Sequence, residues 1–184
     1  MSALRHIPNI ITVFRLLLIP PVAWAIINHQ YKLALVMFFI AGFSDGLDGF
    51  LARVFHWQSK LGSFLDPVAD KILTVVCFFC LTWNGLLPWW LFTIILLRDI
   101  IILGGAAAYH LVTHALEMRP TFVSKFNTAL QIVVILAVLY SNSISPLPDD
   151  LLYAMVSLLF VTTLISGFIY VILWSKKTAQ QRRS

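Results

Sequence analysis

Charged side chains are scarce in this sequence of 184 residues. They account for 11% of the chain, whereas hydrophobic residues account for 60% and the mean hydropathy is +0.89. A soluble globular domain carries about 25% charged residues, so this composition excludes that class. The sequence also lacks low-complexity tracts, long linkers and internal repeats. We therefore expect a single all-α integral membrane domain that covers residues 1–184.

Cysteine is almost absent as well. The two cysteines, Cys77 and Cys80, form a C-x-x-C pattern within the apolar stretch TVVCFFCLT. In a cytosolic protein that pattern would suggest metal or redox chemistry. Because no His, Lys or Gly stands beside it here, we interpret both cysteines as small apolar packing residues.

Long apolar runs fill most of the chain. A membrane-crossing helix needs about 20 mostly apolar residues, and six runs meet that requirement. The letters AWA at 23–25 look like a signal cleavage site, but Arg15 interrupts the apolar core of such a signal. We therefore expect the first run to stay as a helix. The six predicted spans are residues 8–28, 31–51, 63–83, 88–110, 122–141 and 150–174.

The basic residues outside these runs gather on one side of the predicted membrane. With the N-terminus in the cytoplasm, only Lys32 falls at the outer edge, so the positive-inside rule places both termini inside. Anionic lipid headgroups are the natural partner of such a face. No basic helix or aromatic platform stands outside the membrane, so we expect no nucleic-acid partner. The cytoplasmic set is Arg5, Arg53, Lys60, Arg119, Lys125, Lys176, Lys177, Arg182 and Arg183.

Acidic residues are the rarest charged type, and half of them lie close together. Four of the eight fall between positions 45 and 70, namely Asp45, Asp48, Asp66 and Asp70. The first two are three residues apart and the last two four apart, so each pair shares one face of its helix. The short connection 52–60 makes the two helices antiparallel neighbours. All four carboxylates can then meet near the cytoplasmic surface.

Four adjacent carboxylates cannot all stay ionised without compensation, because like charges and burial both raise their pKa values. Even one Asp at the centre of a membrane helix costs about 2.5–3.5 kcal/mol. All-oxygen ligation suits hard divalent ions. Two facing carboxylate pairs favour a two-metal site, and we predict two Mg²⁺ or Mn²⁺ ions.

Small residues and one arginine surround these acids. Gly49 and Gly62 let a ligand approach the backbone closely, and Ala52 extends the small face of the helix. Arg53 ends the segment DGLDGFLAR, where its planar guanidinium can bind phosphate oxygens in bidentate fashion. Metals plus an arginine at a cytoplasmic membrane edge indicate a site for a phosphate-bearing lipid. A charge network that only anchors topology would use lysine and arginine instead of four aspartates.

These residues match a known signature position for position. The pattern is Asp45-x2-Asp48-Gly49-x2-Ala52-Arg53-x8-Gly62-x3-Asp66-x3-Asp70. The sequence therefore resembles the CDP-alcohol phosphotransferase family over nearly its whole length. The resemblance implies that Asp45, Asp48 and Asp66 hold the metals and that Asp70 is both metal ligand and general base. It further implies that Gly49, Ala52, Arg53 and Gly62 cradle the CDP part of the donor, and that the protein is a homodimer.

Family members share the donor site and differ in the acceptor alcohol. Bacterial phosphatidylglycerophosphate synthases typically carry two further cations, where this sequence has Ala106 and Asn127. The Arg98-Asp99 pair and the stretch RPTFVSKFNTALQ instead resemble the mitochondrial-type, CMP-forming cardiolipin synthases. Their acceptor, phosphatidylglycerol, carries one phosphodiester charge in place of the glycerol-3-phosphate dianion. We therefore predict transfer from CDP-diacylglycerol to phosphatidylglycerol, giving cardiolipin and CMP at the cytoplasmic face of the inner membrane, with glycerol-3-phosphate as the alternative acceptor.

Several polar residues in the helices are candidates for binding this acceptor. We expect Lys125 to meet the phosphodiester with Asn127 beside it, and Arg98 is a deeper candidate for the same anion. Arg98 and Asp99 could instead form an internal ion pair. Arg15 could contact the ligand or extend from its helix to the membrane surface. The full candidate set is Arg15, Arg98, Arg119, Lys125 and Asn127.

A cation transporter is the alternative from another class, because it would also place acids within six helices. The aspartates lie at the leaflet edge, however, and no acidic residue continues a path through the outer halves of the helices. Arg53 would also repel the transported cation. These features favour the transferase.

Overall fold

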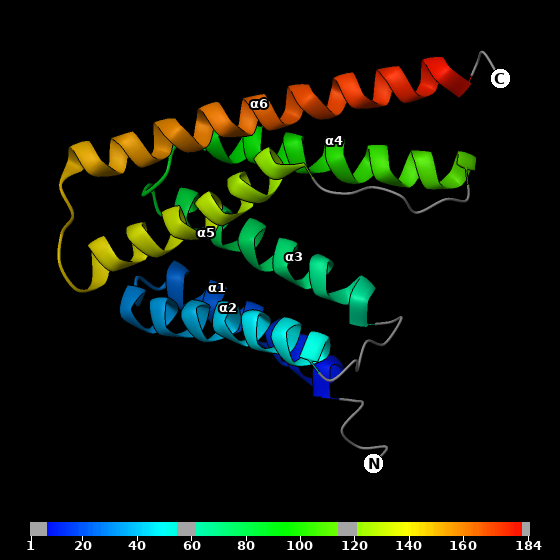
Figure 1. Cartoon of the computed structure of the whole chain (residues 1–184). Helices are drawn as coiled ribbons and strands as arrows, with labels where there is room; N and C mark the ends of the chain where they lie inside the picture. The colour runs from blue at the N-terminus through cyan, green and yellow to red at the C-terminus, as the bar shows by residue number, and fades with distance from the viewer. Residues whose placement is uncertain (1–6, 55–61, 114–120, 182–184) are drawn as a thin grey trace. The chain divides into compact units, whose positions relative to one another are not determined.

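Six α-helices make up nearly all of the computed structural model, which describes residues 7–54, 62–113 and 121–181 (Figure 1). Side chains are described for residues 13–44, 68–105 and 121–173. No strand occurs among the described residues. The helices are α1 (Ile7–Ile27), α2 (Tyr31–Val54), α3 (Gly62–Trp83), α4 (Trp89–Thr113), α5 (Phe122–Ser143) and α6 (Asp149–Gln181).

The predicted apolar runs are all confirmed as helices. Their ends agree with the structure to within three residues except at the end of α6, which continues from the predicted residue 174 to Gln181. The extension has the sequence SKKTAQQ, which contains neither glycine nor proline. Lysine, alanine and glutamine are good helix formers, so α6 continues past its apolar part.

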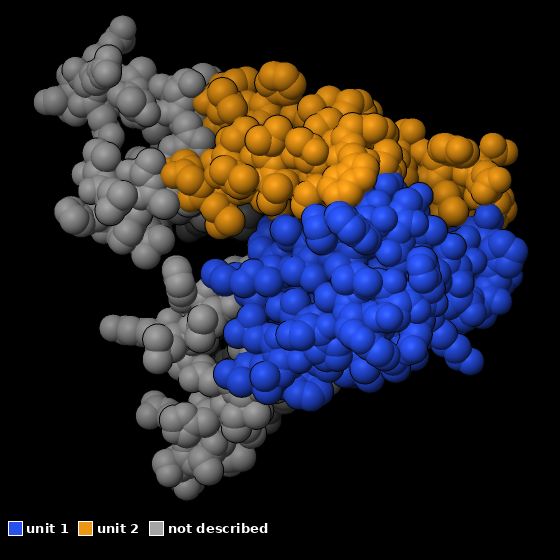
Figure 2. Space-filling view, turned by 180° about the vertical axis from the view of Figure 1, so that it is seen from behind, with its two compact units in different colours: residues 1–87, 135–147 blue, residues 88–134, 148–184 orange. Residues whose placement is uncertain are grey.

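The helices belong to two compact units, coloured separately in Figure 2. Unit 1 comprises residues 1–87 and 135–147, and unit 2 comprises residues 88–134 and 148–184. Within unit 1, α1 packs against α2 and α3, and α2 also contacts α3. Within unit 2, α4 packs against α6. The start of α5 belongs to unit 2 and its end to unit 1.

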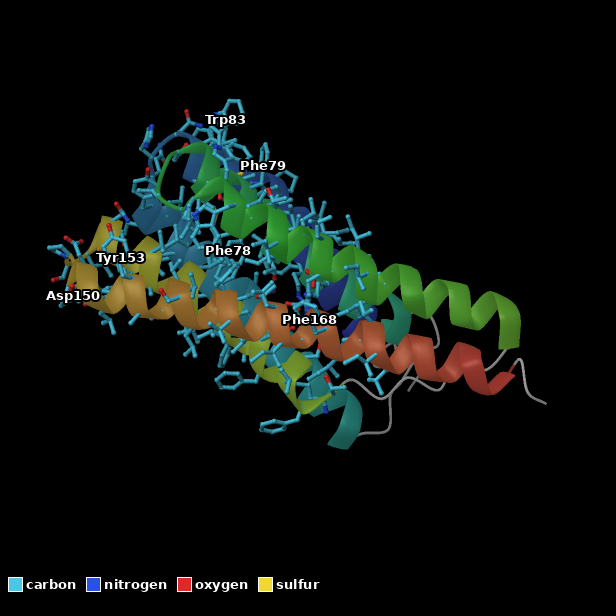
Figure 3. The ribbon with its side chains drawn as sticks, turned by 90° about the horizontal axis from the view of Figure 1, so that it is seen from above. Phe78, Phe79, Trp83, Asp150, Tyr153 and Phe168 are labelled. Carbon is cyan, nitrogen blue, oxygen red and sulfur yellow. The ribbon has the colours of Figure 1, made fainter. Side chains whose placement is uncertain are left out.

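Small and apolar side chains form the core of unit 1. On α3, Cys77 and Phe78 are fully buried, and Cys80 is nearly so. Both cysteines are free thiols, which confirms their interpretation as packing residues. Phe79 and Trp83 on the same helix are instead exposed, as Figure 3 shows. This pattern gives α3 a core-facing side and an outer apolar side.

Many large apolar side chains are exposed in both units. On α6, Tyr153 and Phe168 are 72% and 66% exposed, a degree that suits contact with lipid more than contact with water. Two helical segments of the described chain, Phe122–Ser143 and Asp149–Leu173, are long and apolar enough to cross a membrane by length and composition. The surface and the composition thus agree on a membrane-associated protein.

The ends of α1 and α3 are capped in the same way. At α3, the amide of Leu86 donates to the carbonyl of Leu81 and Gly85 adopts φ 77°. At α1, the amide of Gln30 donates to the carbonyl of Ala25, and the residue with positive φ is His29, at 58°. Both are Schellman caps, in which glycine is the usual residue with positive φ. A histidine in this position is therefore unusual.

Candidate functional site

The signature residues lie on two helices of unit 1. The structure places Asp45, Asp48 and Arg53 on α2, and Asp66 and Asp70 on α3. The two helices run in opposite directions in Figure 1 and contact each other. The predicted spacing therefore holds in the backbone, since each pair of acids occupies one helix at a separation of three or four residues.

Most of the predicted metal ligands lie outside the described side chains. Among the side chains that are described, no three acidic, histidine or cysteine residues come together. Asp70 is the one described signature carboxylate, and it is partly exposed. Its backbone carbonyl accepts a 2.8 Å hydrogen bond from the Thr74 hydroxyl. The predicted metal ligands are two pairs of carboxylates, one pair on α2 and one on α3. Carboxylate oxygens are ligands that suit a hard divalent cation.

The residues predicted to cradle the donor also fall outside the described side chains. Gly49, Ala52 and Arg53 belong to α2, and Gly62 is the first residue of α3. They lie toward the end of α2 and at the start of α3, on the two sides of the connection between Val54 and Gly62. Their contact with a donor stays a prediction.

A buried polar cluster occupies unit 2. Arg98 on α4 is only 4% exposed, and its Nη1 lies 2.6 Å from Oδ1 of Asp99. Its Nε and Nη2 donate to the Ser166 hydroxyl on α6 at 3.1 and 2.8 Å, and Nη2 also donates to the Ser124 hydroxyl on α5 at 2.5 Å. The internal ion pair that the sequence left open is thus confirmed. Arg98 joins three helices through one guanidinium.

One turn along α5, a second polar layer begins at Asn127. The Oδ1 of Asn127 accepts hydrogen bonds from Thr162 and Thr163 on α6, at 2.8 and 2.9 Å. Its Nδ2 is buried and has no hydrogen-bond partner in the described part of the chain. The same holds for both amide atoms of Gln131. Buried amides are almost always hydrogen-bonded, so these atoms are suited to a polar ligand or an ordered water.

Two predicted acceptor residues behave differently from expectation. Lys125 is exposed whereas Asn127 is fully buried. Residues two apart on a helix do not face each other, so the expectation that Asn127 lies beside Lys125 is wrong. Arg15 is fully buried, which rules out its extension to the membrane surface. Arg119 and the side chain of Ala106 lie outside the described residues.

The sequence interpretation missed the partners of this cluster. They are Ser124 on α5, and Thr162, Thr163 and Ser166 on α6; the buried Gln131 on α5 was missed as well. The sequence did contain a signal for the residues on α6, because Thr162, Thr163 and Ser166 are hydroxyl residues in an otherwise apolar helix. Thr162 and Ser166 are four residues apart, which places them on one face of that helix.

An apolar cavity of about 220 Å³, open to the surface, adjoins Arg98 between α4 and α6. Its walls include Leu97 and Ile101 of α4 and Phe168 of α6. Gly167 also lines it, and a Cβ there would lie 3.9 Å from Cγ of Arg98. The buried polar cluster therefore has apolar space directly beside it.

Comparison with known proteins identifies the family. A model of the CDP-alcohol phosphatidyltransferase family matches residues 5–174, and the chain belongs to this family. Its members are membrane-associated, transfer a phosphatidyl group to an alcohol acceptor and generally use a divalent metal. Family membership also disfavours the cation transporter.

Curated relatives carry two different names. The chain is 36% identical to human cardiolipin synthase (CMP-forming) over 149 residues, which is 71% of this chain and 49% of the human protein. It is 35% identical to the rat protein of that name over 149 residues, with the same coverage of 71% and 49%. It is also 36% identical to a CDP-diacylglycerol–glycerol-3-phosphate 3-phosphatidyltransferase of Cereibacter sphaeroides over 136 residues, 70% of this chain and 61% of that protein. The chain thus spans about half the length of the cardiolipin synthases that it matches.

Proposed function

We propose that this protein transfers the phosphatidyl group of CDP-diacylglycerol to a hydroxyl of phosphatidylglycerol, giving cardiolipin and CMP. The observation that carries the acceptor assignment is the polar cluster of unit 2. Arg98 is already paired with Asp99, so the pair has no net charge. The groups without partners beside it, on Asn127 and Gln131, are neutral amides. Such a site suits glycerol hydroxyls better than the dianionic phosphate of glycerol-3-phosphate.

The apolar cavity beside Arg98 supports the same acceptor. Phosphatidylglycerol brings acyl chains in addition to those of the donor, whereas glycerol-3-phosphate brings none. An apolar space of about 220 Å³ next to a polar cluster offers room for part of an acyl chain. Leu97, Ile101 and Phe168 would contact the chain, while the amides of α5 would bind the headgroup.

The donor end of the reaction rests on the signature residues. Bound Mg²⁺ or Mn²⁺, with two ions expected, would neutralise the diphosphate and the departing CMP. Asp45, Asp48, Asp66 and Asp70 would hold the metal. Arg53 would bind the diphosphate oxygens, and Gly49, Ala52 and Gly62 would let the cytidine approach the backbone.

Asp70 has the further role of proton acceptor in this proposal. Its carboxylate would take the hydroxyl proton of the acceptor while the acceptor oxygen bonds to phosphorus and the bond to CMP breaks. The partial exposure of Asp70 leaves a side from which an acceptor could approach. An aspartate is a weak base at neutral pH, so most of its effect would come from holding the hydroxyl in line.

The proposed setting is a six-span membrane domain over residues 1–184. Its shortest helix has 21 residues, which at 1.5 Å per residue gives about 30 Å, the thickness of a bilayer core. The distribution of basic residues supports cytoplasmic termini and an active site at the cytoplasmic face of the inner membrane. A homodimer is proposed from the family resemblance.

A product assay on purified protein tests the acceptor. CDP-diacylglycerol would be supplied with phosphatidylglycerol or with glycerol-3-phosphate in separate reactions containing Mn²⁺. We expect cardiolipin and CMP from the first and little product from the second. Phosphatidylglycerophosphate as the main product would contradict the acceptor assignment while leaving the transferase class intact.

Arg53 allows a test of the donor site. We expect Arg53→Ala to raise the KM for CDP-diacylglycerol about tenfold or more, because a charge-assisted bidentate contact contributes roughly 1.5–3 kcal/mol. Arg53→Lys should recover only part of the loss, since lysine supplies charge without the planar fork. Steady-state kinetics at saturating acceptor measure both. Full recovery by lysine would show that charge alone matters.

A further inference from the structure

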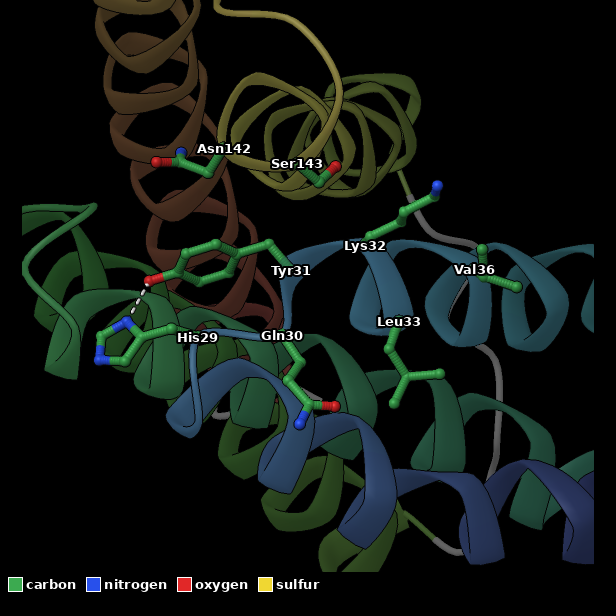
Figure 4. Close-up of a pocket in the computed structure, with 8 residues that line it drawn as sticks. All are labelled: His29, Gln30, Tyr31, Lys32, Leu33, Val36, Asn142 and Ser143. Carbon is green, nitrogen blue, oxygen red and sulfur yellow. Dashed lines mark hydrogen bonds between the residues drawn. The ribbon is translucent and has the colours of Figure 1, made fainter.

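A second cavity lies in unit 1, between the turn that joins α1 to α2 and the last turn of α5. It is an open groove of about 560 Å³ whose lining side chains are mostly exposed, so a ligand there would lie at the surface of the protein. Figure 4 shows Lys32 rising from the first turn of α2 on the side where Asn142 and Ser143 of α5 lie. About 21 Å of helix separate this end of α2 from Asp45. The cavity is therefore distinct from the signature residues.

The turn that forms one wall is held in a fixed shape. His29 has φ 58°, in the left-handed region that residues other than glycine rarely adopt. Its Nδ1 lies 2.7 Å from the Tyr31 hydroxyl. From α3, the Asn84 amide donates to the carbonyl of Ile26 at 2.6 Å and to the Tyr31 hydroxyl at 3.2 Å. The Schellman cap of α1 and these side-chain contacts together hold the turn in one conformation.

The chemistry of the lining favours a phosphodiester. Lys32 supplies one positive charge, and none of the eight lining residues, all in the described part of the chain, is acidic. Gln30, Asn142 and Ser143 add neutral polar groups. Leu33 and Val36 continue the wall along α2 as apolar surface. A single cation, neutral polar groups and an apolar flank together match the phosphate, glycerol and acyl parts of a phospholipid.

Tryptophans place this end of unit 1 at the depth of lipid headgroups. Trp24 lies in the last turn of α1 and Trp83 ends α3, and their side chains are 55% and 65% exposed. Exposed tryptophans gather at the interface between membrane and water. The geometry points to a binding site for the headgroup of an anionic phospholipid, with Lys32 on its phosphate, separate from the site of transfer.

Binding can be measured with a lipid that cannot be a substrate. Dioleoyl phosphatidylmethanol has an anionic phosphodiester but no hydroxyl to accept a phosphatidyl group. The full chain would be titrated with it in dodecylmaltoside micelles, and the apparent Kd taken from the rise in unfolding temperature. Dioleoyl phosphatidylcholine and sodium phosphate form the parallel titrations. We expect saturable stabilisation by phosphatidylmethanol alone.

Substitutions test whether phosphatidylmethanol binds in the groove beside Lys32. Lys32→Ala should weaken binding about fivefold, the effect of one lysine at an anionic lipid surface, and Lys32→Glu should weaken it further. His29→Gly suits the left-handed backbone and removes the imidazole contact to Tyr31, so it should fold and bind less tightly. Thr93→Ala, at an exposed hydroxyl of α4 in unit 2, is the control and should bind as wild type. A phosphatidylmethanol analogue with a photoreactive headgroup should label residues 29–36 or 142–143.

The outcomes separate the possible occupants. Equal stabilisation by sodium phosphate would overturn the lipid as ligand, and equal stabilisation by phosphatidylcholine would overturn recognition of net charge. An unchanged Kd in both Lys32 variants, or labelling confined to other segments, would overturn the site itself. None of these results depends on the transfer reaction, because phosphatidylmethanol is not consumed.

Discussion

Asp70→Asn is expected to lower turnover by roughly two to four orders of magnitude, the usual contribution of a positioned general base. The amide cannot take the proton of the acceptor hydroxyl, although it keeps the size of the carboxylate. The KM for CDP-diacylglycerol should change little, because Arg53 and the other aspartates would still bind the donor. Release of CMP at saturating Mn²⁺ and acceptor measures the effect. Retention of more than a tenth of the wild-type turnover would remove Asp70 from the base role.

A metal titration distinguishes this role from simple loss of a metal ligand. Asp45→Asn and Asp48→Asn should raise the concentration of Mn²⁺ or Mg²⁺ needed for half-maximal activity, so excess metal should restore part of their turnover. Excess metal should not restore Asp70→Asn. Asp150→Asn, at an exposed carboxylate in the first turn of α6, is the control and should behave as wild type.

Asp99→Ala is expected to destabilise the protein by about 3–5 kcal/mol, because it leaves the buried Arg98 charge without its partner. Asp99 is only 5% exposed and lies 2.6 Å from the guanidinium. The two serine hydroxyls that remain on Arg98 are neutral and cannot replace the carboxylate. Unfolding in mixed micelles of dodecylmaltoside and sodium dodecyl sulfate gives the free energy of unfolding.

The exposed Asp150 again provides a comparison, since Asp150→Ala removes one charge from the first turn of α6 and should cost no more than about 1 kcal/mol. Replacing both charges together, as Arg98→Met with Asp99→Leu, should recover much of the stability lost by Asp99→Ala, because a buried pair can often be exchanged for apolar residues. The double variant should still lose activity with phosphatidylglycerol if Arg98 contributes to the acceptor site. A loss below about 1 kcal/mol for Asp99→Ala would show that the pair is effectively solvated.

The helices of this protein could be predicted from the sequence alone. A membrane span depends on a local property, the length of an apolar run, and this property gave the bounds of all six helices to within three residues apart from the end of α6. The signature from Asp45 to Asp70 was equally local, because a spacing of three or four residues determines the face of a helix without reference to the rest of the fold. The sequence by itself therefore determined the fold class, the family and the candidate donor site.

The surroundings of each polar side chain were decided only by the tertiary structure. The sequence allowed Arg98 either a ligand or an ion pair with the adjacent Asp99, and the packing of α4 against α6 buried that pair and added Ser166 as a partner of Arg98. It also allowed Lys125 and Asn127 to share a role, but the orientation of α5 buries one and exposes the other. An apolar run has no strongly polar face from which its orientation could be inferred. Which side of a membrane helix turns inward therefore depends on contacts between residues distant in the chain, and only the folded structure contains them.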